Sequence, residues 1–576
     1  MRLLAFASIV VACACTPAHR RLPALTTTAE TSQWLRTGRY DEAVTLCRAY
    51  AQTYDGVTCD LLGETTQGRP IIALSITRRA SAPVILIQGG IHAGEIEGKD
   101  AGFRFLRDLL DGKVAPGALD AVSIVFIPVL NPDGHERFGP NHRPNQRGPE
   151  EMGFRTNGAR LNLNRDYVKA DSPEIRAELR VVHDRDPMIL VDLHTTDGAQ
   201  FEHDISVIAS PLAPRGDGLE EAASALSGSL QNRLTELGHL PVPFYPSFVD
   251  DTNPHSGFAL GESAPRFSSF FMAARSRIGI LVETHSWRTY RERELSTYHA
   301  LQALFEEATR SAPAWREVMR AADLADSKLG GTEVTMLWKN GEGNHDIAFR
   351  GYAYEKRLSD VTGGTWLVYD EKTPEIWKVP LYDEQLPALT VKVPEGGYIV
   401  DGGFAAAARA VLDAHGIVYN TVDETAQAVE VFRASKVTFS PPYEGRTRAE
   451  VEGAWAAETR TLDRGAIFVP IWQPHARLLL HLFEPQLPDS LVAWGVFNAV
   501  FERKEYIEPY VVEAAAREML AANPALRAEW EAALAATPTM STDDRLDWFA
   551  KRHRAWDERV NLIPVYRTAR NLQLQR

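Results

Sequence analysis

Residues 88–95 read QGGIHAGE, and the apolar residues before them predict a buried β-strand at 83–88. The paired glycines at its end predict a sharp backbone turn, because glycine adopts conformations that other residues disfavour. Such a turn presents His92 and Glu95 at the carboxyl end of the strand, where open α/β sheets bind their ligands. This stretch therefore indicates an α/β fold with a functional site at one edge of the sheet.

Apolar runs and helical patterns alternate on both sides of this stretch. Further strands are predicted at residues 71–76, 122–130, 188–193 and 278–282, and helices at 98–110, 172–184 and 218–237. This alternation is typical of a largely buried sheet with helices packed on its faces.

Two further strands end in residues that bind metals or transfer protons. His194 follows the strand predicted at 188–193, and Glu283 follows the strand predicted at 278–282. A hydrolytic zinc site takes three ligands from His, Asp and Glu and leaves a fourth position open for water. Each residue alone is better explained as the polar start of a loop. Together with His92, their shared position at the ends of separate strands predicts a metal site.

The spacing of His92 and Glu95 is a weak signal by itself. His183 and His481 are also followed by an acidic residue three positions later. However, His183 lies in a charged stretch that ends a predicted helix, and His481 has no further ligand candidate near it in the sequence. His92 differs because paired glycines end the strand before it.

Four short motifs follow in a fixed order. They are NPDG at residues 131–134, RTN at 155–157, LNLNRD at 161–166 and LVET at 281–284. With residues 88–95 and His194, this ordered set resembles the zinc carboxypeptidases of the carboxypeptidase A type. The resemblance covers roughly residues 60–300 and implies a carboxypeptidase-like catalytic domain, an α/β fold with a mixed β-sheet flanked by helices. It also implies a bound Zn²⁺ and hydrolysis of peptide bonds.

The resemblance implies a role for each residue of the metal site. His92, Glu95 and His194 are similar to the zinc ligands of the family, and Glu283 is similar to its general base. These roles are physically reasonable, because a carboxylate beside a zinc-activated water can take the proton and later deliver it to the leaving amine.

Three further residues match the groups with which the family binds its substrate. Arg155 is similar to the arginine that stabilises the oxyanion, and Asn164 and Arg165 are similar to the pair that binds the terminal carboxylate of the substrate. A planar guanidinium matches a carboxylate in bidentate fashion, and a cation stabilises negative charge that develops in the transition state. By residue type alone, both arginines are better explained by surface or structural ion pairs, and it is their spacing that favours the substrate-binding roles.

The sequence departs from the family pattern at two positions. Asn162 stands where the family usually has an aspartate that orients a zinc-bound histidine. Its amide can still accept a hydrogen bond from an imidazole N–H, but it carries no charge. Tyr245 is the only tyrosine between His194 and Glu283, and it lies in a proline-flanked stretch rather than at the position of the family's substrate-binding tyrosine.

These features predict that the protein releases C-terminal residues from peptides with a free C-terminal carboxylate. An alternative is a zinc amidase or deacylase that acts on cell-wall peptides or acylated amino acids, since one fold hosts several chemistries. A second alternative is a binding lipoprotein without turnover. The presence of Glu283 favours an enzyme, because a binding protein needs no base.

The composition of the 576-residue chain is that of a globular protein of several domains. The formal net charge is −14, and no stretch concentrates Lys and Arg, so that nucleic acid is not an expected partner.

Residues 1–20 predict an export signal of the lipoprotein type. The apolar run at residues 3–15 is too short to span a bilayer comfortably but has the length of a signal-peptide core. The letters VVAC at residues 10–13 resemble a bacterial lipoprotein processing box, in which Cys13 is lipidated, and Cys15 is the competing choice. An ordinary cleaved signal or a buried helix is the alternative. We therefore expect an exported protein, periplasmic or membrane-anchored, that contacts a membrane only through a lipid on one of these cysteines.

Cys47 and Cys59 are the remaining cysteines. In an exported protein they are compatible with one disulfide across a short loop or with two buried thiols.

The character of the sequence changes at residues 328–342. Helix-rich sequence at 295–324 precedes strand patterns at 365–369, 389–393 and 467–472, which are followed by helical patterns at 511–521, 526–535 and 542–560. We expect a catalytic domain at 22–325, a β-rich accessory region at 326–440 and a mixed, then helical accessory region at 441–576.

Overall fold

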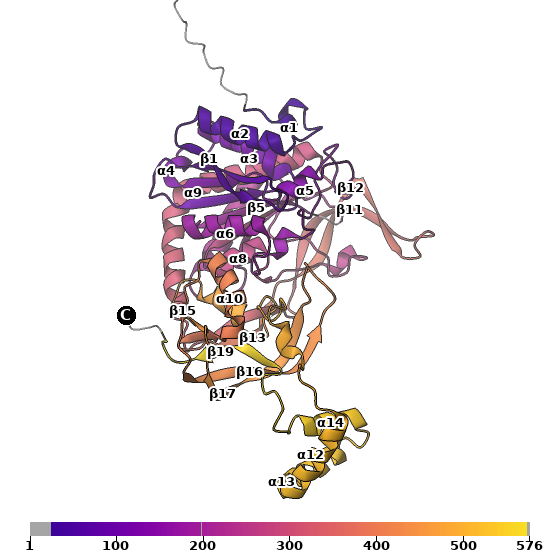
Figure 1. The fold of residues 1–576 in the computed structure, drawn as a ribbon. Coiled ribbons are helices and arrows are strands. Elements are labelled where there is room, and N and C mark those ends of the chain that lie inside the picture. Colours follow the sequence, from indigo (N-terminus) through magenta and orange to yellow (C-terminus); the bar gives the residue numbers. More distant parts are fainter. Residues whose placement is uncertain (1–24, 197–198, 573–576) are drawn as a thin grey trace, which may run out of the picture.

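A mixed eight-stranded β-sheet forms the centre of the first half of the chain (Figure 1). The computed structural model describes residues 25–196 and 199–572. In spatial order the sheet contains β1 (Val57–Glu64), β2 (Pro70–Ile76), β4 (Ser123–Ile127), β3 (Val84–Gly89), β5 (Ile189–Thr195), β9 (Ile278–Thr284), β6 (Ile205–Ser210) and β7 (Pro241–Val242). The four strands from β4 to β9 are parallel, and β2 and β6 run antiparallel to them on either side. The expected α/β fold class, with a mixed sheet flanked by helices, is confirmed.

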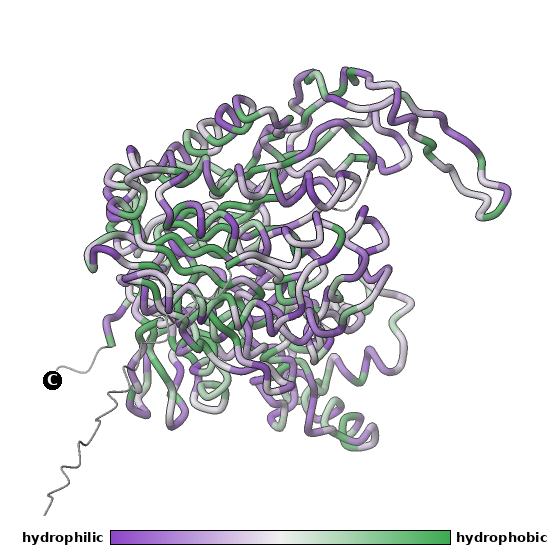
Figure 2. The backbone as a smooth tube through the Cα atoms, turned by 90° about the horizontal axis from the view of Figure 1, so that it is seen from above, coloured by the Kyte–Doolittle hydropathy of each residue, from purple (hydrophilic) through white to green (hydrophobic). Residues whose placement is uncertain are grey.

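Helices cover both faces of this sheet. They include α1 (Thr28–Thr31), α2 (Tyr40–Thr53), α3 (Glu97–Leu110), α4 (Ala118–Ala121), α5 (Pro132–Glu136), α6 (Pro173–Arg185), α7 (Leu219–Glu236), α8 (Ser268–Ala274) and α9 (Tyr290–Asp326), with the 3-10 turns η1 (Leu163–Arg165) and η2 (Pro254–Ser256). Side chains alternate along a strand, so Ile85 and Ile87 pack in the core with α2, α3, α7 and α9, whereas Val84 and Leu86 pack with α6 and α8. Figure 2 shows these strands as hydrophobic segments in the interior.

The core on the α6 and α8 side continues into the C-terminal accessory region. A six-stranded sheet there has the order β15 (Asn420–Thr421), β18 (Ile467–Pro470), β14 (Gly397–Val400), β19 (Leu562–Thr568), β16 (Ala426–Phe439) and β17 (Ala449–Thr461). With α10 (Gly402–His415) and α11 (Ala476–Phe483), it places Val400, Leu412 and Leu479 in one core with Leu86. The two halves are therefore packed together. The boundary expected between residues 440 and 441 falls in the loop that joins the paired strands β16 and β17.

Two antiparallel strand pairs lie between the halves, and the second of them is a hairpin. β10 (Glu333–Asn340) pairs with β13 (Gln385–Lys392), and β11 (His345–Leu358) pairs with β12 (Thr365–Tyr382). The β11–β12 hairpin extends away from the body, while the end of β12 pairs with β8 (Phe258–Ala259) of the first half (Figures 1 and 2). The strand expected at 365–369 is thus the beginning of a much longer one.

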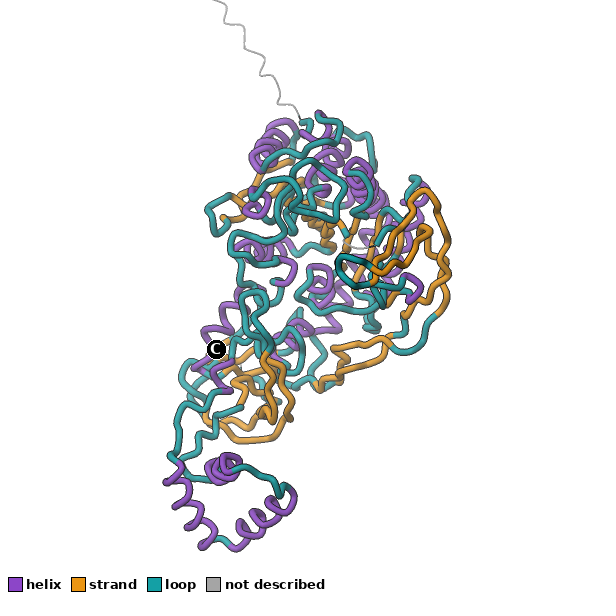
Figure 3. Tube along the Cα trace, turned by 90° about the vertical axis from the view of Figure 1, so that its right-hand side faces the viewer, coloured by secondary structure: helices purple, strands orange, loops and turns teal. Residues whose placement is uncertain are grey.

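Three helices near the C-terminus lie apart from both sheets (Figure 3). They are α12 (Pro509–Ala522), α13 (Pro524–Ala536) and α14 (Thr542–Ala550), and the 3-10 turn η3 (Asn498–Phe501) precedes them. The helix predicted at 542–560 was wrong at its end, because α14 stops at Ala550. Beyond it, His553 and Asp557 accept hydrogen bonds from backbone N–H groups two residues later, and such local bonds compete with a helix.

Cys47 and Cys59 form a disulfide that joins α2 to β1, with 5.4 Å between their Cα atoms. This settles the choice between a disulfide and two thiols. The predicted signal with Cys13 and Cys15 lies outside the described residues. Within residues 25–196 and 199–572, no helix is long and apolar enough to cross a membrane.

Candidate active site

The ends of three adjacent parallel strands meet at one edge of the large sheet. His194 on β5 lies opposite Glu283 on β9, and Leu193 lies opposite Gly89, the last residue of β3. After β3 the chain turns through Gly90, whose φ of +60° favours glycine. A Cβ atom on Gly89 would lie 2.9 Å from the carbonyl oxygen of Pro128, so this position also excludes a side chain. The two glycines therefore allow the turn that carries the next residues to the ends of β5 and β9.

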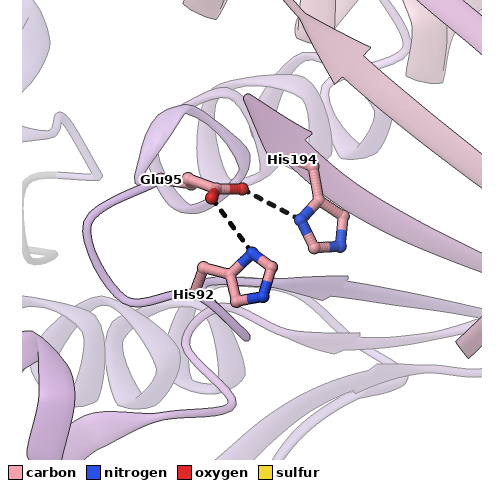
Figure 4. A group of neighbouring side chains, drawn as sticks. All are labelled: His92, Glu95 and His194. Carbon is pink, nitrogen blue, oxygen red and sulfur yellow. Dashed lines mark hydrogen bonds and ion pairs between the residues drawn. The ribbon is translucent and has the colours of Figure 1, made fainter. Parts of the chain in front are cut away.

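His92, Glu95 and His194 converge at this edge (Figure 4). The Nδ1 atom of His92 lies 3.0 Å from Oε1 of Glu95, and Nδ1 of His194 lies 2.9 Å from Oε2 of the same carboxylate. All three side chains are buried, and their potential ligand atoms lie within 4.8 Å of one another. Two imidazole nitrogens and one carboxylate form the donor set of a catalytic zinc site, so these residues fit Zn²⁺.

Hydrogen bonds on the far side of each imidazole fix which nitrogen faces Glu95. Nε2 of His92 lies 3.0 Å from Oδ1 of Asn162, and Nε2 of His194 lies 2.7 Å from Oδ2 of Asp192. Partners of this kind select the tautomer and the ring orientation of a metal ligand. Asn162 thus contacts His92 at the place where the family usually has an aspartate.

The two imidazoles have opposite pKa shifts, although both contact Glu95. Burial lowers the pKa of His92 to about 4. Burial also acts against the charged form of His194, but the negative charge and the hydrogen bond of Asp192 raise its pKa well above the ordinary value. The difference follows from the neighbours, because Asp192 carries a charge and Asn162 does not.

A buried arginine keeps Glu95 ionised. Nη2 of Arg143 lies 2.7 Å from Oε1 of Glu95, and Nη1 of Arg155 lies 3.7 Å from the same atom. Burial alone would raise the pKa of Glu95, but the charge of Arg143, followed by the two histidines, holds it well below the ordinary value. The ionised form is the one that a metal requires of a carboxylate ligand.

A cavity of about 500 Å³ opens beside this cluster. The predicted functional residues that line it are His92, Arg155, Asn164, Arg165, His194 and Glu283. Tyr245 lines it too, as do the apolar residues Ile208, Leu212, Phe267, Phe270 and Leu281. Glu262 adds a further carboxyl group, and burial raises its pKa to about 7.

The predicted carboxylate-binding pair lies in η1. Oδ1 of Asn164 accepts a hydrogen bond from the Ser268 backbone N–H at 3.0 Å, so its NH₂ group is the part that can donate to a substrate. Arg165 donates from Nη1 to the Asn164 carbonyl oxygen at 2.7 Å, and its guanidinium lies 4.2 Å above the ring of Phe267. Arg155 reaches the cavity with about a third of its side chain exposed.

A sequence model of the zinc carboxypeptidase family matches residues 44–235. The matched segment contains His92, Glu95 and His194, and also the RTN and LNLNRD motifs, but it ends before Glu283. Residues 44–235 are thus similar to the zinc carboxypeptidase family. This match agrees with the expected family and with the expected enzyme class, a zinc metallocarboxypeptidase. Because the family consists of zinc enzymes, the metal expected at the His92–Glu95–His194 cluster is zinc.

Several solved structures are similar to the chain. A metallo-carboxypeptidase from Burkholderia cenocepacia is 17% identical with a TM-score of 0.35 and covers 46% of this chain and 68% of its own. A metallo-carboxypeptidase from Pseudomonas aeruginosa in complex with (2-guanidinoethylmercapto)succinic acid is 16% identical with a TM-score of 0.34, covering 47% of this chain and 69% of its own. Carboxypeptidase A from Helicoverpa armigera is 15% identical with a TM-score of 0.36, covering 49% and 75%. No curated protein sequence matches the chain.

Sequence reasoning missed Asp192 and Arg143. Asp192 precedes His194 by two residues on the same strand, so both side chains point to the same side of the sheet. The two-residue alternation of side chains along a strand could therefore have revealed Asp192 as a neighbour of His194. Arg143 lies in a loop outside the quoted motifs, and no pattern of period or spacing marks it.

Proposed function

We propose that this enzyme removes the C-terminal residue of peptides that carry a free C-terminal carboxylate. The main support is a single cavity that contains a carboxylate base and two arginines beside the metal cluster. Peptide hydrolysis at a terminus needs these groups together, because a proton, an oxyanion and a carboxylate must be held at once.

The residues of the cluster would hold the metal. When bound by His92, Glu95 and His194, zinc supplies a Lewis acid and lowers the pKa of water toward neutrality. Asn162 and Asp192 hold the outer nitrogens of the two histidines, so that both Nδ1 atoms point to one place.

Glu283 moves the proton in the proposed reaction. It accepts a proton from the attacking water and delivers it to the amine of the departing residue. The register of β5 and β9 sets this carboxylate beside His194, and only 7% of its surface is exposed. Low exposure limits competition from bulk water for that proton.

The two arginines bind different charges of the substrate. Arg155 donates to the oxygen that becomes negative as the carbonyl is attacked, where a fixed positive charge stabilises the transition state more than the ground state. Arg165 binds the terminal carboxylate with two parallel N–H donors, and Asn164 adds a further donor. A substrate whose terminal carboxylate is bound by Arg165 would present its last peptide bond to Arg155 and Glu283, which line the same cavity.

A pair of matched peptides tests this proposal. One has a free C-terminus and its twin is amidated, and both are incubated with the zinc-loaded protein while mass spectrometry identifies the cleaved bonds. Amidation removes a charge-assisted contact that contributes about 1.5 to 3 kcal/mol, so we expect kcat/KM to fall roughly tenfold or more. Equal cleavage of the two peptides would contradict the proposal and favour an amidase or deacylase. Cell-wall fragments and acylated amino acids would then be tested as substrates in the same assay.

We also propose that the enzyme is exported and lipidated on Cys13 or Cys15. The apolar run at 3–15 and the VVAC letters support this, and the disulfide between Cys47 and Cys59 is compatible with an oxidising compartment. Mass measurement of the mature N-terminus is the test. A lipid-modified cysteine is the expected result, and an unmodified N-terminal residue beyond Cys15 would contradict lipidation.

A further inference from the structure

The loop between β16 and β17, residues 440–448, touches the segment that contains the predicted carboxylate-binding pair. Tyr443 Oη accepts a hydrogen bond from Nε of Arg165 at 3.1 Å. The next residue, Glu444, accepts a hydrogen bond from the backbone N–H of Asn162 at 2.8 Å. Arg446 forms an ion pair with Asp171 at 2.5 Å. The accessory region thus contacts the catalytic domain at several points along residues 162–171.

This loop is itself held in one conformation. Tyr443 and Arg446 exchange two backbone hydrogen bonds around a tight turn, in which Glu444 has a φ of +49° and Gly445 a φ of +75°. Glycine suits such a turn, whereas glutamate rarely adopts a positive φ. At this position the unusual backbone directs the Glu444 carboxylate onto Asn162. A strained residue that makes a contact at the edge of an active site points to a functional constraint.

Packing also fixes the ring of Tyr443. The ring stacks on Trp494 with 6.1 Å between centroids and 18° between planes, and Trp494 is fully buried. The guanidinium of Arg448 lies 5.8 Å from the Tyr443 ring centroid. The hydroxyl group of Tyr443 is therefore presented to Arg165 by a rigid support rather than by a mobile side chain.

The chemistry of the contact suits a residue that orients Arg165 without neutralising it. Two N–H groups of the Arg165 guanidinium are engaged by the chain, one by Tyr443 and one by the Asn164 carbonyl oxygen. A guanidinium has five N–H donors in one plane, so these two bonds fix the plane while three donors remain for a ligand. A carboxylate at the place of Tyr443 would compete with an anionic substrate, whereas a phenol hydroxyl leaves the positive charge of Arg165 available.

We infer that Tyr443 is a positioning residue for Arg165, and that the accessory region completes the end of the active site that recognises the substrate's carboxylate. This inference rests on the proposed role of Arg165 in binding that group. It gives the accessory region a part in substrate binding, since a guanidinium held in the right plane loses less entropy when the substrate binds.

The first test compares Tyr443→Phe with the native full-length, zinc-loaded enzyme. Phenylalanine keeps the ring on Trp494 but removes the hydroxyl. For a free-acid peptide we expect KM to rise roughly fivefold, because Arg165 keeps its charge but loses one bond that orients it, with kcat within twofold of the native value. Cleavage of the amidated twin is expected to be unchanged. Tyr419→Phe is the matched control, because Tyr419 also lies in the accessory region and donates its hydroxyl to Asp413 at 2.9 Å, but not to the catalytic domain.

The second test is a double-mutant cycle with Arg165→Ala. Because Tyr443 is inferred to act through Arg165, Tyr443→Phe is expected to have no further effect in the Arg165→Ala background. Additive effects, or equal damage to the free and amidated peptides, would overturn the inference and indicate a merely structural residue. If Arg165→Ala weakens binding of the free acid but Tyr443→Phe does not, only the inference about Tyr443 fails. If Arg165→Ala itself has no effect, the proposed carboxylate site fails together with it.

Discussion

His194 and Glu283 lie opposite each other on neighbouring strands of one sheet, whereas Arg165 and Tyr443 meet across 278 residues of chain. In the first region a single register fixes the distance between the groups. In the second, the orientation of one side chain depends on the packing of the accessory region against the catalytic domain. The comparison suggests that the machinery for bond cleavage is built into the sheet, while recognition of the substrate's terminus is shared between two parts of the molecule.

The largest effect is expected from His194→Ala. Removal of one of three ligands from the cluster should reduce zinc from about one ion per chain to nearly none and abolish hydrolysis, because two ligands hold zinc weakly. Elemental analysis and peptide hydrolysis are measured on the same sample. His183→Ala is the control, since this exposed histidine also has an acidic residue three positions later. Zinc retained at full stoichiometry by the His194 variant would mean that the metal lies elsewhere.

The next effect separates metal binding from proton transfer at the same edge of the sheet. Glu283→Gln preserves size and position but cannot accept a proton. We expect normal zinc content and a loss of turnover of roughly 10²- to 10⁴-fold. Near-native turnover in this variant would assign the base to another residue.

A smaller effect is expected from the residues behind the two imidazoles. Asp192→Asn would give both histidines a neutral amide partner, and Asn162→Asp would give both a carboxylate. Since such partners change metal affinity by about 10- to 100-fold, the first variant should lose zinc to a competing chelator more readily and the second less readily. Chelator titration of the purified variants measures this, and unchanged zinc retention in both would show that these contacts do not tune the metal.

The strand-end residues could be predicted from the sequence because their signals are local. Apolar runs marked β3, β5 and β9, and the residue after each run, or shortly after it, carried the functional group. Asp192 was within reach of the same reasoning, because side chains two residues apart share a face. Arg143 and Tyr443 were not, since neither lies at a strand end or in a periodic pattern. Their positions are set by tertiary packing, which single-sequence patterns do not encode.

Accessory elements illustrate the same limit. The helices α12 and α13 were predicted near their observed ends, because their local propensity is strong. Long β-strands such as β12 were seen only in part, since much of β12 is exposed and lacks a buried face to create an apolar run. The contact of residues 440–448 with the active site has no local signature at all.

A buried carboxyl group on α6 makes the stability of the catalytic domain depend on pH. Burial raises the pKa of Glu178 to about 8, and Tyr167 donates a hydrogen bond to it at 2.8 Å. From pH 4.5 to pH 8 the unfolded state loses this proton while the folded state keeps it, so the native protein loses stability as the pH rises. Relative to Glu178→Gln, that loss is about 1.4 kcal/mol per pH unit within this window. Denaturant unfolding at several pH values measures it, and a constant difference between the two proteins would contradict the raised pKa.

The smallest effect is expected where the loop at 440–448 meets the catalytic domain through charge. Arg446 and Asp171 form an ion pair at 2.5 Å, with about a third and a quarter of their side chains exposed. Partly exposed pairs contribute roughly 0.2 to 1 kcal/mol, so Arg446→Ala should lower the free energy of unfolding by no more than this. Because the pair anchors the loop that carries Tyr443, KM for free-acid peptides should also rise about twofold, without a change for amidated ones.

Lys436→Ala is the matched control. Lys436 on β16 forms an exposed ion pair with Glu452 on β17, the two strands that the loop at 440–448 joins, and this pair does not reach the catalytic domain. If both variants lose similar stability but only Arg446→Ala changes KM, the loop acts on substrate binding. Equal KM values in the two variants would limit the Arg446–Asp171 pair to holding the halves together.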